Sequence, residues 1–352
     1  MQLHIVMNEL LHKYLFTSLL ILCINTCVWA QQEDKLAGTA TGTIAQAKPA
    51  GSSAKQADSL RSGNAREQMN NAWWTGPMLA PSAGTLPKGH FLAEPYLYDV
   101  TTPHTNSFGS LTYLLYGLAN GFTVGAIPTF GFNKVSSGLS SSGIGAGDAT
   151  LVTQYRLTKF HEGNWLPAAA LNVQETFPTG KYDHLGDRPA DGFGSGAYTT
   201  TVSLYLQTYF WLNTGRILRM RFNTSEAFSA NVNIQDASVY GTETGFRGHA
   251  EPGSSLSFDA SWEYSLTSNW VFALDIGYKL NDNTYVTGYN NSIQNPPVIQ
   301  FNSGPSRVLI FAPAIEYNWN SSLGILIGTR LIPAGTNVTA SVTPVVAVNF
   351  VY

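Results

Sequence analysis

The stretch Asn337–Tyr352, with the sequence NVTASVTPVVAVNFVY, decides the fold. In an extended strand, successive side chains point to opposite faces. One face of this stretch is then apolar and ends in aromatic residues, and it holds Val338, Ala340, Val342, Pro344, Val346, Val348, Phe350 and Tyr352. The other face is small and largely polar. A strand of about ten residues with lipid on one side and water on the other needs this pattern. A half-buried strand of a secreted β-sandwich would show the same alternation, so the remaining chain has to distinguish the two.

The composition favours a membrane barrel over a soluble domain. Charged residues make up 12% of the 352 residues, well under the ~25% of soluble domains. The mean hydropathy is −0.04, and barrels give such values because polar lumen residues cancel the lipid-facing ones in any window average. The net charge of −3 gives no nucleic-acid footprint, so we expect no nucleic-acid partner.

Residues 1–30 are typical of a secretory signal peptide. A basic residue precedes an apolar run at 14–24, and residues 28–30 fit a small-residue cleavage site. A single anchoring helix is the alternative, but polar residues directly after the run leave it too short to span a bilayer comfortably. Both cysteines, Cys23 and Cys27, lie in this segment, so the mature chain would contain none.

Three further regions follow the signal peptide. Residues 31–71 are rich in Ala, Gly, Gln and Ser without apolar periodicity, which predicts a flexible periplasmic arm. Residues 72–90 are irregular and aromatic, so we expect them to pack as a plug in a barrel or as a cap on its periplasmic mouth. Residues 91–352 predict an outer-membrane β-barrel.

Alternation and turn residues predict about twelve strands in this last region. They cover roughly 91–100, 109–118, 122–134, 147–158, 165–177, 197–212, 216–229, 254–266, 270–280, 305–319, 323–332 and 337–352. Short turns alternate with long connections, the longest at 135–146, 178–196, 230–253 and 281–304. This asymmetry is typical of outer-membrane barrels, and an even strand count puts both chain ends on the short-turn, periplasmic side. The predicted fold class is therefore all-β, a transmembrane antiparallel β-barrel.

Four residues conflict with regular strands that face lipid. Pro128, Pro313 and Pro344 lie inside predicted strands, and each removes a hydrogen bond from the ladder. Glu175 falls on an outward face, which is tolerable only near the loop end of its strand.

Charged residues of both signs recur at positions that point inward. These lumen-lining candidates are Asp148, Arg156, Arg219, Arg221, Asp259, Glu263, Asp275, Lys279, Glu316 and Arg330. Two interpretations stay open, because the charges could pair and fill the lumen or form a transverse field that sorts solutes. Arg219 and Arg221 share a face, and Asp259 and Glu263 are their nearest acidic candidates.

Motifs of enzymes and cofactor sites are missing from the sequence. It contains no Gly-x-Ser-x-Gly elbow, no HExxH and no P-loop. The glycine-rich stretches 143–147 and 192–196 precede strands instead of helices, and no two histidines have metal-ligand spacing. We therefore expect no catalytic residue, no cofactor and no metal. A barrel phospholipase is compatible with the fold, but no stretch resembles its catalytic motif.

Five stretches carry a family resemblance, namely Trp74–Pro77, Leu86–His90, Phe177–Tyr182, Asp191–Tyr198 and Pro313–Asn318. They resemble the outer-membrane transporters assigned to the MetA pathway of phenol degradation, over about 73–352. The resemblance implies a β-barrel in the outer membrane and uptake of aromatic or other hydrophobic compounds, the latter through pathway association alone. It brings no functional residues. The terminal aromatics Phe350 and Tyr352 also resemble the C-terminal signal for barrel assembly.

We expect a monomeric outer-membrane channel of a Gram-negative bacterium for passive uptake of small solutes, aromatic or hydrophobic ones among them. Small aromatics would stack on Tyr205 and Tyr209. The expected partners are outer-membrane lipid and lipopolysaccharide, the barrel assembly machinery and a small-molecule solute. The alternative is a non-transporting structural or adhesive barrel whose long loops bind partners.

Overall fold

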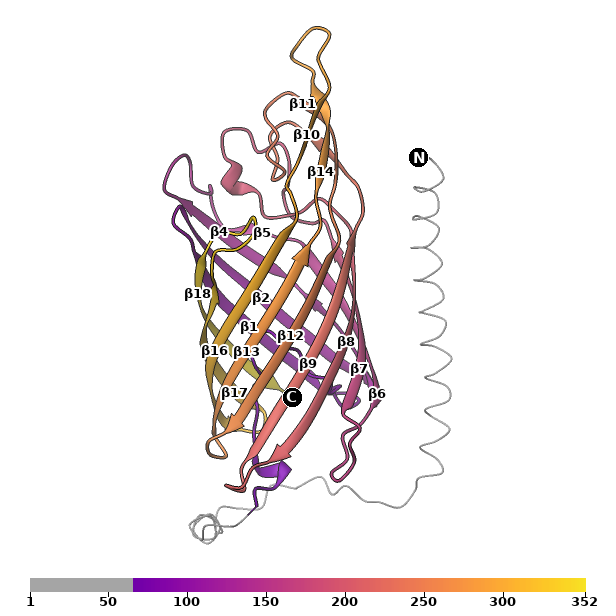
Figure 1. Ribbon diagram of the computed structural model, residues 1–352, viewed down its shortest axis with the longest axis vertical. Helices are drawn as coiled ribbons and strands as arrows, with labels where there is room; N and C mark the ends of the chain where they lie inside the picture. The colour runs from indigo at the N-terminus through magenta and orange to yellow at the C-terminus, as the bar shows by residue number, and fades with distance from the viewer. Residues whose placement is uncertain (1–65) are drawn as a thin grey trace. The chain divides into compact units, whose positions relative to one another are not determined.

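The computed structural model describes residues 66–352, so the expected signal peptide and residues 31–65 of the expected arm lie outside the described part. Twelve antiparallel strands close into a barrel (Figure 1). The order around the wall is β1-β18-β17-β16-β13-β12-β9-β8-β7-β6-β3-β2, and pairing between β1 and β2 closes the ring. The predicted fold class is confirmed.

The barrel strands lie close to the predicted ranges. They are β1 (Phe91–Thr101), β2 (Thr105–Ala119), β3 (Phe122–Ile127), β4 (Thr129–Val135), β6 (Ala149–Thr158), β7 (Ala168–Phe177), β8 (Thr199–Trp211), β9 (Ile217–Ser229), β12 (Ser255–Ser265), β13 (Trp270–Asn281), β16 (Ser306–Asn320), β17 (Leu323–Ile332) and β18 (Ser341–Val351). We count β3 and β4 as one strand, since both pair with β2 and only Pro128 separates them. The short β5 (Gly145–Ala146) pairs with β4.

The terminal strand shows how the wall is built. Val346 and Phe350 point outward and are 39% and 45% exposed, whereas Val345 and Ala347 point inward and are 7% and 1% exposed. The same alternation of exposed apolar and buried side chains recurs around the wall. An apolar surface of this extent is typical of a wall that faces lipid, and closure of the ladder leaves no open sheet edge. β18 begins at Ser341 because Asn337 has a φ of 50° and belongs to a turn.

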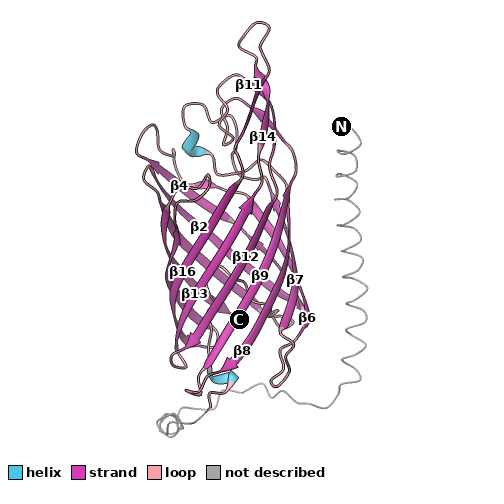
Figure 2. Cartoon of the chain, in the orientation of Figure 1, coloured by secondary structure: helices cyan, strands magenta, loops and turns pink. Residues whose placement is uncertain are grey.

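The connections differ between the two ends of the barrel. One end, here called the short-turn end, carries the connections β2–β3, β6–β7, β8–β9, β12–β13 and β16–β17 together with the C-terminus. The other end, the long-loop end, carries the four longest connections, which are β4 to β6, β7–β8, β9 to β12 and β13 to β16 (Figure 2). It also carries β17–β18 and the short connection β1–β2. Among residues 66–352, no helix is long and apolar enough to cross a membrane. The predicted loop asymmetry is therefore present.

Two long connections contain structure that the sequence did not predict. β10 (Val232–Gln235), β11 (Phe246–Glu251), β14 (Tyr285–Asn290) and β15 (Ile299–Asn302) form a separate four-stranded sheet. Val232, Ile234, Phe246 and Val286 form its buried face. Each strand has only four to six residues, which is too short for alternation to stand out from loop sequence.

The structure accommodates the three prolines and Glu175 in different ways. Pro128 interrupts a strand, whereas Pro313 and Pro344 stay inside continuous strands. Glu175 points outward and accepts a hydrogen bond of 2.6 Å from Thr200 Oγ1. It lies two residues before the loop end of β7 at Phe177, where the sequence argument required it.

Candidate functional site

Residues 66–90, here called the lumen segment, run through the interior of the barrel. The segment enters at the short-turn end, where Glu67 N donates to Gly215 O over 2.9 Å. It leaves at the same end, where Gly89 N donates to Gly117 O over 2.8 Å. Between these points its partners are inward side chains of the wall. Because entrance and exit share one end, the segment forms a loop inside the barrel and does not thread through it.

The entrance is fixed by a buried carboxylate. Glu67 is 6% exposed and lies 2.9 Å from Arg216 Nη1. It also accepts hydrogen bonds from Ile217 N at 3.1 Å and from Ser265 Oγ at 2.8 Å. The expected flexible arm therefore ends earlier than residue 71, because this network holds the residues that follow Glu67, including the short 3-10 helix Met69–Asn71.

Two acidic residues of the wall bind backbone N–H groups of the lumen segment. Glu316 Oε2 accepts from Thr75 N at 2.7 Å and from Gly76 N at 3.2 Å. Asp275 Oδ2 accepts from Met78 N at 2.8 Å and from Leu79 N at 3.2 Å. Both carboxylates have no exposed surface. The Met78 side chain also packs against a buried apolar cluster that includes Tyr96 and Leu326.

Side chains with N–H donors bind the carbonyl groups that follow in the lumen segment. Arg221 Nη1 donates to Ala80 O at 2.7 Å, Asn223 Nδ2 donates to Pro81 O at 3.0 Å, and Gln154 Nε2 donates to Ser82 O at 3.0 Å and to Gly84 O at 2.8 Å. Between Thr75 and Gly84, the wall therefore binds N–H groups of the segment first and carbonyl groups next.

Arg219, Arg221 and Glu263 form a buried ion cluster beside the lumen segment. Glu263 binds Arg219 in a bidentate pair and lies 3.2 Å from Arg221 Nε. Glu263 has no exposed surface, and each arginine is 6% exposed. The Trp74 ring lies 4.5 Å from the Arg219 guanidinium. At this level the charges pair and fill the lumen, which is the first of the two sequence interpretations.

The other predicted lumen residues lie apart from this cluster. Asp259 pairs in register with Asn223 instead of an arginine. Within residues 66–352, Asp259, Lys279 and Arg330 take part in none of the ion pairs, although all three occupy inward positions near the long-loop end. Arg156 lies inward at the short-turn end, beside Gly121.

Asp148 differs from the expectation, because it anchors a loop instead of lining a strand. Its carboxylate accepts from Gly180 N at 3.0 Å, from Ser195 N at 2.7 Å and from Ser195 Oγ at 2.7 Å. Tyr240 OH donates to Ser195 O at 2.6 Å, and burial raises the pKa of Tyr240 to about 12. Two of the stretches that carry the family resemblance, Phe177–Tyr182 and Asp191–Tyr198, therefore meet in one loop network.

The neutral polar residues of the site were missed by the sequence argument. Gln154, Asn223 and Asn318 bind the lumen segment and occupy the same inward positions as the charges. The alternation pattern could have found them, but only charged residues were singled out. The expected stacking platform differs too, because Tyr205 is 3% exposed and the Tyr209 ring packs 5.0 Å from the Phe160 ring.

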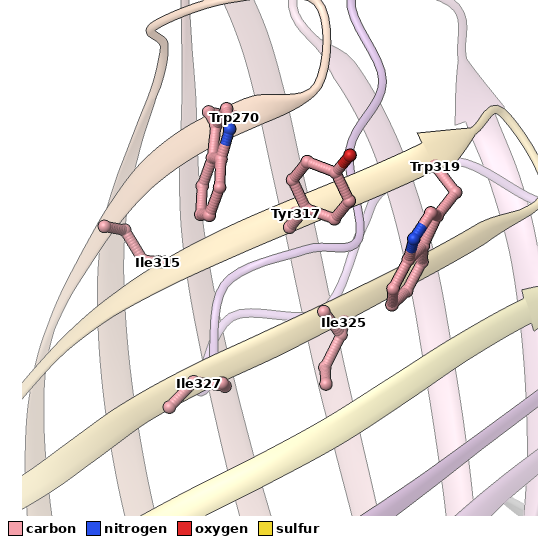
Figure 3. Close-up of a pocket in the computed structure, with 6 residues that line it drawn as sticks. All are labelled: Trp270, Ile315, Tyr317, Trp319, Ile325 and Ile327. Atoms are coloured by element: carbon pink, nitrogen blue, oxygen red, sulfur yellow. The ribbon is translucent and has the colours of Figure 1, made fainter.

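Two further features of the described part concern metal binding and surface pockets. Among residues 66–352, no group of three or more His, Cys, Asp or Glu side chains is arranged to hold a metal ion. A depression of about 260 Å³ lies on the outer wall near the short-turn end (Figure 3), and it is lined by Trp270, Ile315, Tyr317, Trp319, Ile325 and Ile327. Aromatic residues at this level are typical of the belt that meets the membrane interface.

Comparison with known proteins gives structural likeness only. No protein-family model matches the chain, and no curated protein matches it. The chain is similar to the crystal structure of an outer membrane channel from Pseudomonas putida F1, with 15% identity, 78% of this chain and 100% of that chain covered, and a TM-score of 0.59. The NanC and KdgM porins match at 12% and 10% identity, over 73% of this chain and 98% of theirs, with TM-scores of 0.39 and 0.35. The first likeness shows the barrel fold, while the family resemblance of the sequence stays a prediction.

Proposed function

We propose that the protein is an outer-membrane channel through which small solutes pass passively once the lumen segment has moved. The observation that carries this proposal is the loop path of the segment. Its entrance and exit lie at the same end, so it can leave the lumen without opening the wall between any two strands. Its departure would uncover a water-accessible row of charged and amide side chains, which is how pores sort solutes.

Locking the segment in place is the direct test. A Cβ on Gly324 would meet the Thr75 Oγ1, so cysteines introduced by Thr75→Cys and Gly324→Cys lie within reach of a disulfide. The only cysteines of the chain are Cys23 and Cys27, within the expected signal peptide, so no other thiol competes once that peptide has been removed. The purified full-length variant would be recorded in planar bilayers under oxidising conditions and after addition of a reductant.

We expect the oxidised variant to stay closed and the reduced variant to conduct as the unmodified protein does. The single variant Thr75→Cys is the control, because it carries one thiol without the bond and adds no atom to the wall. Equal conductance of the oxidised and reduced forms would show that solutes do not need the segment to move. A protein that never conducts would contradict the channel itself.

The proposed location rests on the apolar outer wall and on the terminal strand. Phe350 is 45% exposed and Tyr352 is 82% exposed, both at the short-turn end, where aromatics meet the interface and where the assembly machinery would bind. Removing residues 350–352 should sharply reduce folded, heat-modifiable protein in the outer membrane. Normal insertion of the truncated chain would contradict both the location and the assembly signal.

The proposed orientation places the long loops outside the cell. Protease added to intact cells should then cut within 281–304, where residues 291–298 lie between β14 and β15 without strand structure. The turns near Asn213 and Asn320 should be spared. Cleavage at those turns instead would invert the orientation.

Aromatic or hydrophobic solutes are a finer proposal, supported only by the sequence resemblance. The test compares entry of a small phenol into proteoliposomes with entry of a sugar of similar size. Equal permeability of the two, corrected for leakage through protein-free vesicles, would remove the aromatic preference and leave the channel proposal intact.

An adhesive barrel is the second candidate, and the four-stranded sheet at the long-loop end favours it. Tyr285 and Tyr289 are 51% and 46% exposed on one face of this sheet, beside Arg247 and Glu251 of the neighbouring strand. Exposed tyrosines among charged groups are typical of binding surfaces. Replacing both tyrosines by serine should abolish cell binding in an adhesin and leave the conductance of a channel unchanged.

A further inference from the structure

Two buried acidic residues of the wall, Asp275 and Glu316, here called the acidic wall, hold the lumen segment by its backbone N–H groups. Asp275 and Glu316 each use one oxygen for two successive backbone N–H groups. Neutral Asn and Gln carbonyls could accept the same hydrogen bonds without the large cost of burying a charge. Holding the segment therefore does not explain why these two residues are acids.

The second oxygen of each acid points to the same conclusion. Asp275 Oδ1 and Glu316 Oε1 are buried and have no hydrogen-bond partner in the described part of the chain. Ser261 Oγ, which lies opposite Asp275 in the ladder, is also without a partner. A buried unpartnered carboxylate oxygen is rare and requires an explanation. The closed arrangement satisfies only half of what the acidic wall can bind.

The partners of the segment are also ordered along its length. N–H groups from Thr75 to Leu79 face the acids, and the carbonyl of Ala80 faces Arg221. Six extended residues span at most about 20 Å. An isolated peptide that followed this path in this direction would place its ammonium group at Glu316 and its terminal carboxylate at Arg221. Both ends would then meet opposite charge, and the carboxylate would meet a guanidinium group that can bind it bidentately.

We propose that this part of the lumen is a binding site for short linear peptides of up to about six residues, which the lumen segment occupies as a resident peptide. The proposal rests on the channel function, because a peptide can enter only after the segment has moved. Main-chain recognition leaves the side chains of the peptide largely free.

The test uses the full-length protein in planar bilayers and the hexapeptide TGPMLA with free amino and carboxyl ends, which copies Thr75–Ala80. We expect it to interrupt the open-channel current reversibly. The matched control is the same peptide with N-methyl groups on its methionine and leucine, which removes the two N–H donors that face Asp275. Hydrogen bonds to charged groups are strong enough that this control should block at least ~10-fold more weakly. A hexapeptide with acetylated and amidated ends should also block more weakly, because both end charges are lost.

A second measurement connects binding with passage. Proteoliposomes should swell faster in an unblocked tripeptide than in a sugar of similar mass. If the free hexapeptide and its N-methylated control block the current equally, the peptide site is overturned and the channel stays in place. A protein without current in any condition, including the reduced cysteine pair, would overturn the channel instead. The peptide measurements need no substitution in the wall, so misfolding cannot mimic their result.

Discussion

The two halves of the barrel interior contain the same kinds of residue in different states. Near the short-turn end, Arg219, Arg221 and Glu263 are buried, and each arginine forms an ion pair with Glu263. Near the long-loop end, Asp259 and Lys279 are at least partly exposed, although they also alternate with apolar residues. The alternation that points a charge inward is therefore the same in both halves.

The difference comes from the lumen segment, which lies only in the half of the interior next to the short-turn end, here called the lower half. The half next to the long-loop end is called the upper half. Its main chain covers Asp275 and Glu316 and excludes water from the cluster around Glu263. Excluding water makes each charge dependent on its partner, because an isolated buried charge is costly. Near the long-loop end, Asp259 and Lys279 keep exposed surface, and a charge that reaches water is screened and needs no partner. Inward charge thus has a structural role in one half, and in the proposed channel it would face the solute in the other.

The largest expected effect separates these roles. Glu263→Ala leaves two buried arginines without their common partner, so we expect a loss of about 3–5 kcal/mol in the free energy of unfolding. Asp259→Ala, four residues away on the same face of β12, should cost less than about 1 kcal/mol. Urea titration with heat-modifiable mobility as the readout measures both. Equal losses would mean that the two halves do not differ.

Much of this comparison could not be predicted from the sequence. The inward positions of Arg219, Glu263 and Glu316 follow from a period of two, because neighbouring residues of a strand face opposite sides. Their burial does not follow, since it depends on a segment without periodicity whose path is set by contacts far along the chain. The prediction that Asp148 lines the lumen was wrong for a related reason. Asp148 precedes its strand, which begins at Ala149, so the alternation does not apply there.

A smaller effect concerns the anchor of the lumen segment. Glu67→Ala removes an ion pair with Arg216 and two further hydrogen bonds, so we expect about 2–3 kcal/mol in favour of the displaced segment. This corresponds to roughly 30–150-fold in the open fraction. The open probability in bilayers measures it. The matched control is Glu162→Ala, whose partner Arg66 is 52% exposed and which should change little.

The next prediction moves to the upper half. Lys279→Glu and Arg330→Glu reverse inward charges that belong to no ion pair in residues 66–352. In a salt gradient, the reversal potential should move toward cations by on the order of a few millivolts. The shift should shrink as salt rises from 0.1 M to 1 M, because the Debye length falls from about 10 Å to about 3 Å. A shift that does not depend on salt would contradict a water-screened upper lumen.

The smallest effect is expected at the long-loop end, where Asp191 joins the loop 178–196 to Ser142. The backbone N–H of Ser142 donates to Asp191 over 2.7 Å, and this hydrogen bond holds the pKa of Asp191 below its ordinary value of 3.8. A lowered pKa in the folded loop means that the carboxylate stabilises the loop fully above pH 3.8, and that this stabilisation is lost as the pH falls through the lowered pKa. Amide exchange at Ser142 should therefore keep its protection between pH 7 and pH 5 and lose less than ~10-fold of it in stronger acid, since the side chain is only partly buried. Asp191→Asn keeps an acceptor oxygen but cannot titrate, so its protection should not depend on pH in this range. A loss between pH 7 and pH 5 in both proteins would assign the transition to another group and would show that the Asp191 contact does not control the loop.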